Sequence, residues 1–276
     1  MNKITRSLLG FCLVLSCSCI VSAQEKKPME NHSIPRVMQI TREFVKPGKT
    51  GFEHDATESA FVQAERRANW PTHYLGMTSL SGKSRALFLT QYASFDAWEK
   101  DYAAQAKNPE FAAALDRAGV ADGELLEDID AGVFVFSDEM SLRPHADLSD
   151  FRYMEISAYH VREGHDAEWS EIVKMVKAAY EKSIPDAHWG MFEEMYGGEN
   201  GTYIVLTGRK NLAEIDRGFM DSKKFEEALG PDGMKKLDEL AASAIESSTH
   251  NLFAIDPQMS YVDESWIKAY PDFWKP

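Results

Sequence analysis

Hydrophobic and polar positions follow the same course twice along the chain. Segments 36–45 and 152–161 alternate apolar and polar residues, which is typical of a half-buried β-strand. A glycine-containing turn follows each segment, at Pro47-Gly48 and at Glu163-Gly164. An amphipathic helix is expected next. In the second copy its apolar face is formed by Trp169, Ile172, Val173, Val176 and Tyr180.

The rest of each copy predicts a hairpin, a helical region and a last strand. Asn200-Gly201 is a tight-turn pair between segments 189–196 and 202–209, and Ser81-Gly82 takes the same place in the first copy. Helical regions are expected over 95–130 and 212–248. The resulting order, β-α-β-β-α-β, is that of a ferredoxin-like unit.

Direct matches in order along the chain indicate an internal duplication. Met38 and Ile40 match Met154 and Ile156, and both copies end in Met-Ser after an apolar segment. The stretch Tyr74-Leu75-Gly76-Met77 is aligned with His188-Trp189-Gly190-Met191, and Leu89 with Leu206. We therefore predict an α+β protein of two tandem ferredoxin-like units, residues 35–145 and 150–256, paired sheet to sheet as one pseudo-symmetric barrel.

The N-terminal 23 residues have the pattern of a secretory signal peptide. Lys3 and Arg6 precede an apolar run, and Val21-Ser22-Ala23 is a small-residue cleavage site. Removal of this segment predicts a secreted protein, in the bacterial periplasm, with residues 24–34 as a flexible lead-in. Lipidation of Cys17 instead of removal is left open.

Composition excludes several classes of function. The 276 residues include 44 acidic and 30 basic side chains, a formal charge of −14, which argues against nucleic-acid binding. All three cysteines lie within the signal segment, so the mature chain has no disulfide, thiolate metal site or cysteine nucleophile. We find no second long apolar run that would span a membrane, and no metal, nucleotide or hydrolase motif. The sequence identifies no cofactor and predicts no metal site.

The repeated unit resembles a known superfamily. The first strand ending in Val45-Lys46-Pro47-Gly48-Lys49, the Gly76-Met77 pair and the duplication are similar to the dimeric α+β barrel proteins, which include NIPSNAP-like proteins and antibiotic-biosynthesis and haem-degrading monooxygenases. The resemblance implies a barrel built from two such units, here on one chain. It does not carry over the haem-degrading Asn, Trp and His set, since the cluster of Asn69, Trp70 and His73 is better interpreted as a helix end.

Strand alternation predicts two faces for each sheet. The apolar face, with Met38, Ile40 and Met154, is expected to pack on the helices. The more polar face is expected to line the barrel interior. Burying ionisable groups costs several kcal/mol unless they are paired or hydrated, so such a face indicates a pocket or an exposed surface. The predicted lining residues are Gln39, Glu43, Tyr74, Tyr92, Glu155, Tyr159, His188, Phe192, Glu194, Tyr203 and Arg209.

Within this set, His188 is the first candidate for chemistry, as a general base or a metal or haem ligand. Glu155 is the expected orienting carboxylate, and Tyr74 is the expected symmetry counterpart of His188. The remaining lining residues are assigned to ligand binding. A purely structural, hydrogen-bonded His188 is the alternative.

Three functions remain open from the sequence. The first is binding of a small apolar or aromatic molecule in the barrel interior, with or without catalysis. The second is a cofactor-free or haem-type monooxygenase-like enzyme. The third is a structural or interaction module that uses the aromatic tail, residues 257–276, in which Tyr261, Trp266, Tyr270, Phe273 and Trp274 occur. The ligand, any reaction and association into a homodimer are not specified.

Overall fold

The computed structural model describes residues 34–145 and 147–275. The predicted signal peptide and all but Ile34 of the predicted lead-in lie outside the described residues. None of the helices in these two ranges is long and apolar enough to cross a membrane.

The described chain consists of two halves with a similar order of elements, followed by two short helices. The first half contains β1 (Val37–Val45), α1 (Phe52–Ala68), β2 (Tyr74–Ser79), β3 (Arg85–Tyr92), α2 (Phe95–Ala106), α3 (Pro109–Gly123) and β4 (Leu126–Leu142). The second half contains β5 (Tyr153–Val161), α4 (Asp166–Ser183), β6 (Trp189–Tyr196), β7 (Thr202–Arg209), α5 (Ala213–Ala244) and β8 (Ile245–Ile255). The C-terminal helices are α6 (Glu264–Ala269) and α7 (Pro271–Trp274).

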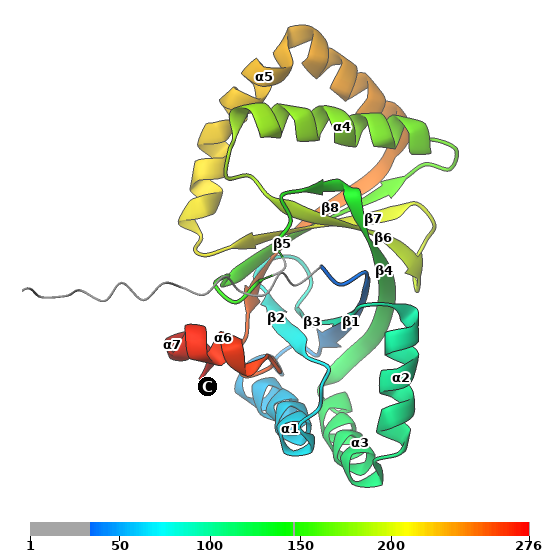
Figure 1. Ribbon diagram of the computed structural model, residues 1–276, viewed down its shortest axis with the longest axis vertical. Coiled ribbons are helices and arrows are strands. Elements are labelled where there is room, and N and C mark those ends of the chain that lie inside the picture. Colours follow the sequence, from blue (N-terminus) through cyan, green and yellow to red (C-terminus); the bar gives the residue numbers. More distant parts are fainter. Residues whose placement is uncertain (1–33, 146, 276) are drawn as a thin grey trace, which may run out of the picture. The chain divides into compact units, whose positions relative to one another are not determined.

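The eight strands form one closed antiparallel barrel in the order β1-β3-β2-β8-β5-β7-β6-β4. Each half supplies four neighbouring strands, and the two seams are the pairs β4–β6 and β2–β8. This order is consistent with a ferredoxin-like unit in each half. The halves join edge to edge through hydrogen bonds, which differs from the expected pairing of two facing sheets (Figure 1). Because the barrel is closed, every strand has a hydrogen-bonded neighbour on each side and the sheet has no open edge.

The predicted hairpins are confirmed, and the last strands are longer than predicted. Strands β6 and β7 have the predicted bounds, and Gly201 between them has a φ of 79°, which favours glycine. The predicted helical regions extended to residues 130 and 248, but β4 begins at Leu126 and β8 at Ile245. Helix α5 is itself interrupted at Gly230-Pro231, where the backbone leaves the helical conformation.

The barrel interior is an apolar core to which all eight strands contribute. Its members from the strands are Met38, Ile40, Leu75, Met77, Leu87, Leu89, Phe134, Met154, Ile156, Phe192, Ile204, Leu206, Phe253 and Ile255. The predicted orientation of the faces is therefore wrong for β1, β2, β3, β5 and β7, whose apolar side chains point inward. The physical reason is that side chains fill the interior of this closed eight-stranded barrel, and a filled interior favours residues that need no water.

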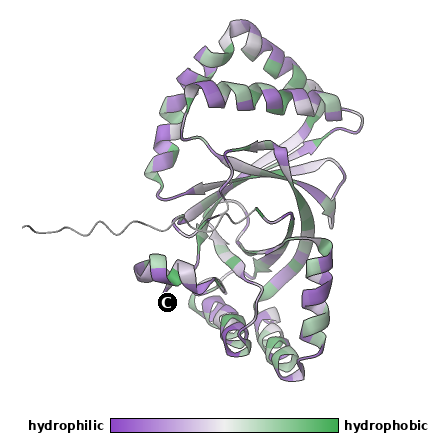
Figure 2. Ribbon diagram, in the orientation of Figure 1, coloured by the Kyte–Doolittle hydropathy of each residue, from purple (hydrophilic) through white to green (hydrophobic). Residues whose placement is uncertain are grey.

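The outer face of the barrel packs against helices. Helices α4 and α5 lie over the strands of the second half, and α1, α2 and α3 lie over those of the first half (Figure 1). On α4, Trp169, Ile172 and Val173 form a second apolar cluster with Trp189 and Met191 of β6. Hydrophobic and hydrophilic positions alternate along these helices, as Figure 2 shows. The prediction for β6 is thus correct, because Trp189 and Met191 do face the helices.

The aromatic tail packs on the barrel. Trp274 is 1% exposed, belongs to the barrel's apolar core, and donates a hydrogen bond from its indole N–H to the carbonyl oxygen of Ser149 at 2.9 Å. The guanidinium of Arg152 lies 3.9 Å from the ring centre of Phe273. The tail's anchoring ring is therefore not available to a partner, which weakens the interaction-module alternative.

We expect Trp274→Ala to destabilise the protein by about 3–5 kcal/mol, because it removes a fully buried ring and leaves a cavity. Chemical denaturation followed by circular dichroism measures this loss. Phe219→Ala is the matched control, since Phe219 is 76% exposed on α5. Equal stability of the two variants would contradict the anchoring role.

Candidate functional site

A cavity of about 950 Å³ lies between the outer face of the second half of the barrel and helices α4 and α5. Protein interiors are otherwise packed with few voids larger than a water molecule, so a space of this size between a sheet and its covering helices is a specific feature. Its volume falls within the range of small-molecule sites, about 300–1,000 Å³. Two further cavities of the described chain are smaller, at about 40 and 280 Å³.

The inner wall of the cavity is apolar and rich in aromatic rings. The strands contribute Tyr159, Trp189, Met191, Val205 and Ile245, and α4 contributes Trp169, Ile172, Val173, Val176 and Tyr180. The rings of Tyr180 and Trp189 meet edge to face with their centres 5.4 Å apart. Burial raises the pKa of the Tyr159 and Tyr180 hydroxyls above their usual range, so both remain neutral phenols at physiological pH.

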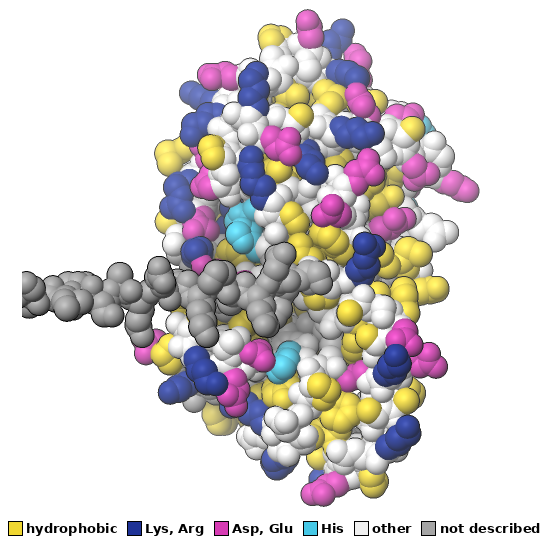
Figure 3. Space-filling view, in the orientation of Figure 1, with side chains coloured by type: hydrophobic (Ala, Val, Ile, Leu, Met, Phe, Trp, Pro, Cys, Tyr) yellow, Lys and Arg dark blue, Asp and Glu magenta, His cyan; other side chains and the backbone are white. Residues whose placement is uncertain are grey.

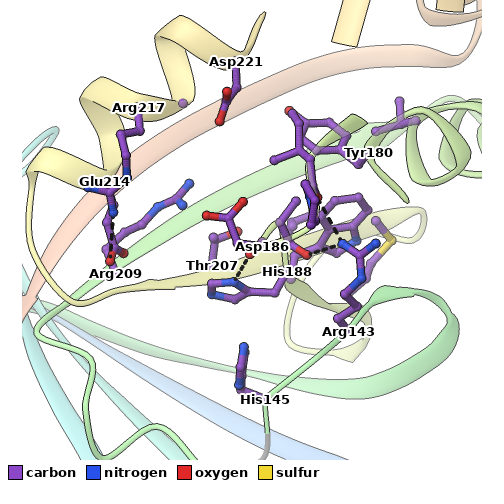
Figure 4. Close-up of a pocket in the computed structure, with 18 of the residues that line it drawn as sticks. Arg143, His145, Tyr180, Asp186, His188, Thr207, Arg209, Glu214, Arg217 and Asp221 are labelled. Carbon is purple, nitrogen blue, oxygen red and sulfur yellow. Dashed lines mark hydrogen bonds and ion pairs between the residues drawn. The ribbon is translucent and has the colours of Figure 1, made fainter. Parts of the chain in front are cut away.

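Charged and polar side chains are placed around the outer part of the cavity. Figure 4 shows Glu214, Arg217 and Asp221 on α5, Arg209 at the end of β7, and Arg143 after β4. Arg143 donates hydrogen bonds to the backbone carbonyl oxygens of Ile184 and Ala187, both at 3.1 Å. It also donates a longer one, of 3.3 Å, to the backbone carbonyl oxygen of Glu181. Not all of its five N–H groups are used in this way. The Arg143 guanidinium is therefore a fixed positive charge, and it has N–H groups that these backbone contacts do not use.

Three further cations at this cavity are paired with carboxylates. Arg209 binds Glu155 with Nε–Oε2 and Nη2–Oε2 distances of 2.8 and 2.6 Å. Arg217 lies 3.3 Å from Glu214, and Lys210 pairs with Asp150. These pairs hold the polar groups in place and leave the rim with both signs of charge. Acidic and basic side chains are likewise interspersed on the molecular face that Figure 3 shows.

Two histidines meet at the same cavity. The rings of His145 and His188 are perpendicular, with centres 4.5 Å apart. His188 Nδ1 lies 3.0 Å from the carbonyl oxygen of Asp186, and its Nε2 lies 3.1 Å from that of Gly208. Carbonyl oxygens only accept hydrogen bonds, so both ring nitrogens of His188 are directed at backbone acceptors. Burial, and then the neighbouring His188, lower the pKa of His145.

The structure brings together only part of the predicted site. His188, Tyr159 and Arg209 line the cavity, and Glu155 reaches it through its ion pair with Arg209. Tyr203 lies beside them on the outer face, where its ring packs on Trp169 with centres 5.2 Å apart. These five residues do share one region, but it lies outside the barrel and under α4 and α5, whereas the prediction placed it inside.

The other predicted residues lie elsewhere. Gln39, Glu43, Tyr74 and Tyr92 are on the outer face of the first half, where the ring of Tyr92 stacks on Trp98 and the Glu43 carboxylate faces His54. Phe192 and Glu194 point into the barrel. Phe192 packs against Phe136, and burial raises the pKa of Glu194, whose Oε1 has no hydrogen-bond partner. These six residues do not join the cavity.

The strand register also corrects the expected equivalence of Tyr74 and His188. Leu75 pairs with Leu89 in the first half, and Gly190 pairs with Leu206 in the second. Since Leu89 corresponds to Leu206, Leu75 corresponds to Gly190, and Tyr74 therefore to Trp189. His188 lies one position earlier, before β6 begins. The predicted alignment of the two copies was thus one residue out of register at this strand.

Several cavity residues were not predicted. Arg143 and His145 lie in the connection between the halves, and Arg217 and Asp221 lie on α5, outside the strands from which the pocket was predicted. Tyr180 and Val176 were assigned to the apolar helix face, which is correct. The available signal was this helix face, which carries more aromatic surface than a helix packed tightly on a sheet needs.

Comparison with family models and with curated proteins found no match. Solved structures do match. An anthrone oxidase-like protein is 13% identical, covering 83% of this chain and 95% of that one with a TM-score of 0.55. A candidate monooxygenase from Fusobacterium nucleatum is 10% identical, covering 80% and 93% with a TM-score of 0.53. A candidate chlorite dismutase is 12% identical, covering 82% and 97% with a TM-score of 0.46.

These neighbours belong to the dimeric α+β barrel superfamily, so the expected kind of fold is confirmed. At such identities the likeness is one of fold. The NIPSNAP-like part of the resemblance stays a prediction.

We expect His188→Ala to raise the pKa of His145 toward the usual value for histidine, because the neighbouring imidazole is one of the causes that lower it. NMR titration of the His145 ring resonances measures this change. His250→Ala is the control, since the His250 ring is hydrogen-bonded to the Ser157 hydroxyl on another part of the sheet. An unchanged or lower His145 midpoint in His188→Ala would contradict the described geometry.

Proposed function

We propose that this protein binds a flat, mainly apolar aromatic molecule with a polar or anionic edge, in the cavity between the barrel and helices α4 and α5. The observation that carries the proposal is the cavity itself, about 950 Å³ with an aromatic inner wall. An apolar space of this kind with a few converging polar groups is the usual form of a small-molecule site. We also propose, from the signal-peptide pattern of residues 1–23, that this binding takes place in the bacterial periplasm.

The aromatic class of ligand follows from the inner wall. Trp169, Tyr180 and Trp189 offer ring faces and edges, and the aliphatic side chains of Val176 and Val205 lie among them. Planar rings bind such a wall by offset or edge-to-face contacts at a low cost in side-chain entropy. An aliphatic chain would fit the volume of the cavity, but it could not form these offset or edge-to-face ring contacts.

The polar edge of the ligand follows from the cations at the rim. Arg143 has N–H groups beyond those bound to the backbone, and Arg209 and Arg217 stand across the cavity in ion pairs. Phenolic, ketonic or carboxylate oxygens match these donors. One neighbour with a TM-score above 0.5 has a name that refers to anthrone, a tricyclic ketone, which supports the same class of ligand.

The large cavity lies in the second half, and the first half holds a smaller one of about 280 Å³, so we propose that the duplicated barrel is functionally asymmetric. In the first half, Tyr92 stacks on Trp98 and Trp70 stacks on Phe111, and such contacts fill the corresponding layer. The duplication then supplies two similar halves, of which one became the binding half.

Oxygenation of the bound molecule is the second candidate function. Its support is His145, whose lowered pKa keeps a neutral imidazole at the cavity that can accept a proton from an acidic ligand. The names of the two neighbours, an anthrone oxidase-like protein and a candidate monooxygenase, point in the same direction. Haem ligation by His188 does not fit, because both ring nitrogens face backbone carbonyl oxygens.

The binding proposal is tested with anthrone as the probe and the full mature chain. We expect saturable quenching of tryptophan fluorescence, since Trp169 and Trp189 line the cavity. Val176→Trp fills the cavity and is expected to weaken binding on the order of tenfold or more. Val120→Trp is the matched control, because Val120 is 73% exposed on α3. Equal affinity in the two variants, or no saturable binding, would contradict the proposal.

Mass spectrometry of the same incubations in air separates binding from catalysis. Recovery of unchanged anthrone supports a binding protein. Protein-dependent conversion of anthrone and O₂ to anthraquinone and water, with one oxygen atom of O₂ in the new ketone and the other in the water, supports oxygenation. His145→Gln is then expected to slow it. Haemin is the comparison probe. Haemin that binds through an axial histidine, seen as a shift of its Soret band, and that displaces anthrone would favour the haem-type alternative.

A further inference from the structure

A second cluster of chemistry-bearing side chains lies in the first half, away from the cavity. Glu43 of β1, His54 and Glu58 of α1 and Asp122 of α3 place one ligand atom each within 4.8 Å of all the others. It is the one group of this kind among residues 34–145 and 147–275. All four side chains are buried, with exposed fractions of 7%, 2%, 3% and 2%.

The distances suit a metal ion. His54 Nε2 lies 3.4 Å from Glu43 Oε2, 3.5 Å from Asp122 Oδ1 and 3.9 Å from Glu58 Oε1. Ligand atoms about 2.1 Å from a tetrahedral ion are separated by about 3.4 Å. At 3.4–3.9 Å the contacts are long for hydrogen bonds, so the four groups surround a common point more than they bind one another.

A buried carboxylate oxygen that has no hydrogen-bond partner indicates a cation-binding site. Glu58 Oε1 faces His54 and has no hydrogen-bond partner, although the side chain is almost fully buried. Three carboxylates share this space with one imidazole, and within residues 34–145 and 147–275 no lysine or arginine forms an ion pair with them. Such a concentration of buried negative charge needs a compensating positive charge.

The surroundings support a built site with access. Thr57 donates a hydrogen bond to Asp122 Oδ1 at 2.8 Å, which fixes the orientation of that carboxylate as outer-shell groups do at metal sites. His54 also lines a separate cavity of about 280 Å³, together with Thr50, Gly51 and Asp256. This cavity is a route by which an ion can reach the cluster.

We propose that Glu43, His54, Glu58 and Asp122 form a binding site for a divalent first-row transition ion, such as Zn²⁺ or Mn²⁺. One imidazole with three carboxylates is a nitrogen and oxygen set that these ions accept. Ca²⁺ takes six to eight oxygen ligands and is therefore expected to bind poorly. The ion connects β1, α1 and α3, so it fixes two helices of the first half on the barrel. The proposed ligands come from three separate elements, and their local signal in the sequence is His54 and Glu58 one helical turn apart, from which no metal site was predicted.

The test uses the full mature chain, treated with EDTA, dialysed and titrated with Zn²⁺ or Mn²⁺. We expect one ion per chain by calorimetry and by elemental analysis after gel filtration. The bound ion is expected to raise Tm by roughly 5–10 °C at about a hundredfold excess over Kd. With Mn²⁺, pulsed electron paramagnetic resonance is expected to show coupling to an imidazole nitrogen.

Two variants and one control assign the site. His54→Ala and Glu58→Gln are expected to weaken affinity on the order of a hundredfold. Glu58→Gln keeps the side-chain shape and removes a charge, so it tests the site even where His54→Ala does not fold. Glu65→Gln is the control, because Glu65 is a half-buried carboxylate on the same helix with an unpartnered oxygen, outside the cluster. Absence of a bound ion in the wild-type chain, or equal affinity in Glu58→Gln and Glu65→Gln, overturns the proposal.

Discussion

Closure of the eight-stranded barrel is the constraint on which the other features of this protein depend. Hydrogen bonding across the β4–β6 and β2–β8 seams leaves no free sheet edge, and it creates an interior that water cannot readily enter. Most strands therefore direct their more apolar face inward, as Met38, Met154 and Leu206 do. Strand β6 differs, because its Trp189 and Met191 face the helices. The more polar face is then left for the layer between barrel and helices, and that layer holds both the cavity and the buried His54 cluster.

The two halves use this outer layer differently. In the second half, α4 and α5 stand over the sheet with an aromatic-lined space beneath them, and cations and carboxylates are paired around its rim. In the first half, stacked aromatic rings occupy the layer between the barrel and its helices. Four buried side chains of types that ligate metal ions also lie there, and they connect β1, α1 and α3. We propose that the second half binds a molecule and that a bound ion fixes the helices of the first half. The tail, anchored by Trp274, covers part of the same barrel core.

Local pattern was sufficient to predict most elements, because strand alternation, the Asn200-Gly201 turn and the α4 face are signals within a few residues. It was not sufficient for the direction of the faces, since an amphipathic strand has the same pattern whether its apolar side meets a helix or a barrel interior. The one-residue difference between His188 and Trp189 also needed the strand register. Arg143, Asp122 and Arg217 come from connections and helices that only the folded chain brings to their sites. His188, Tyr159 and Arg209 were predicted to line the barrel interior, and they line the cavity outside it instead.

The central claim is that the ligand binds outside the barrel and beneath α4 and α5. Methyl NMR of the full mature chain, titrated with anthrone, tests this claim most directly. We predict shifts and intermolecular contacts at Ile172, Val173, Val176 and Val205, which line the cavity, with Ile40, Leu89 and Ile156 of the barrel interior unchanged. Perturbations centred on the interior methyl groups, with those of α4 unaffected, would contradict it.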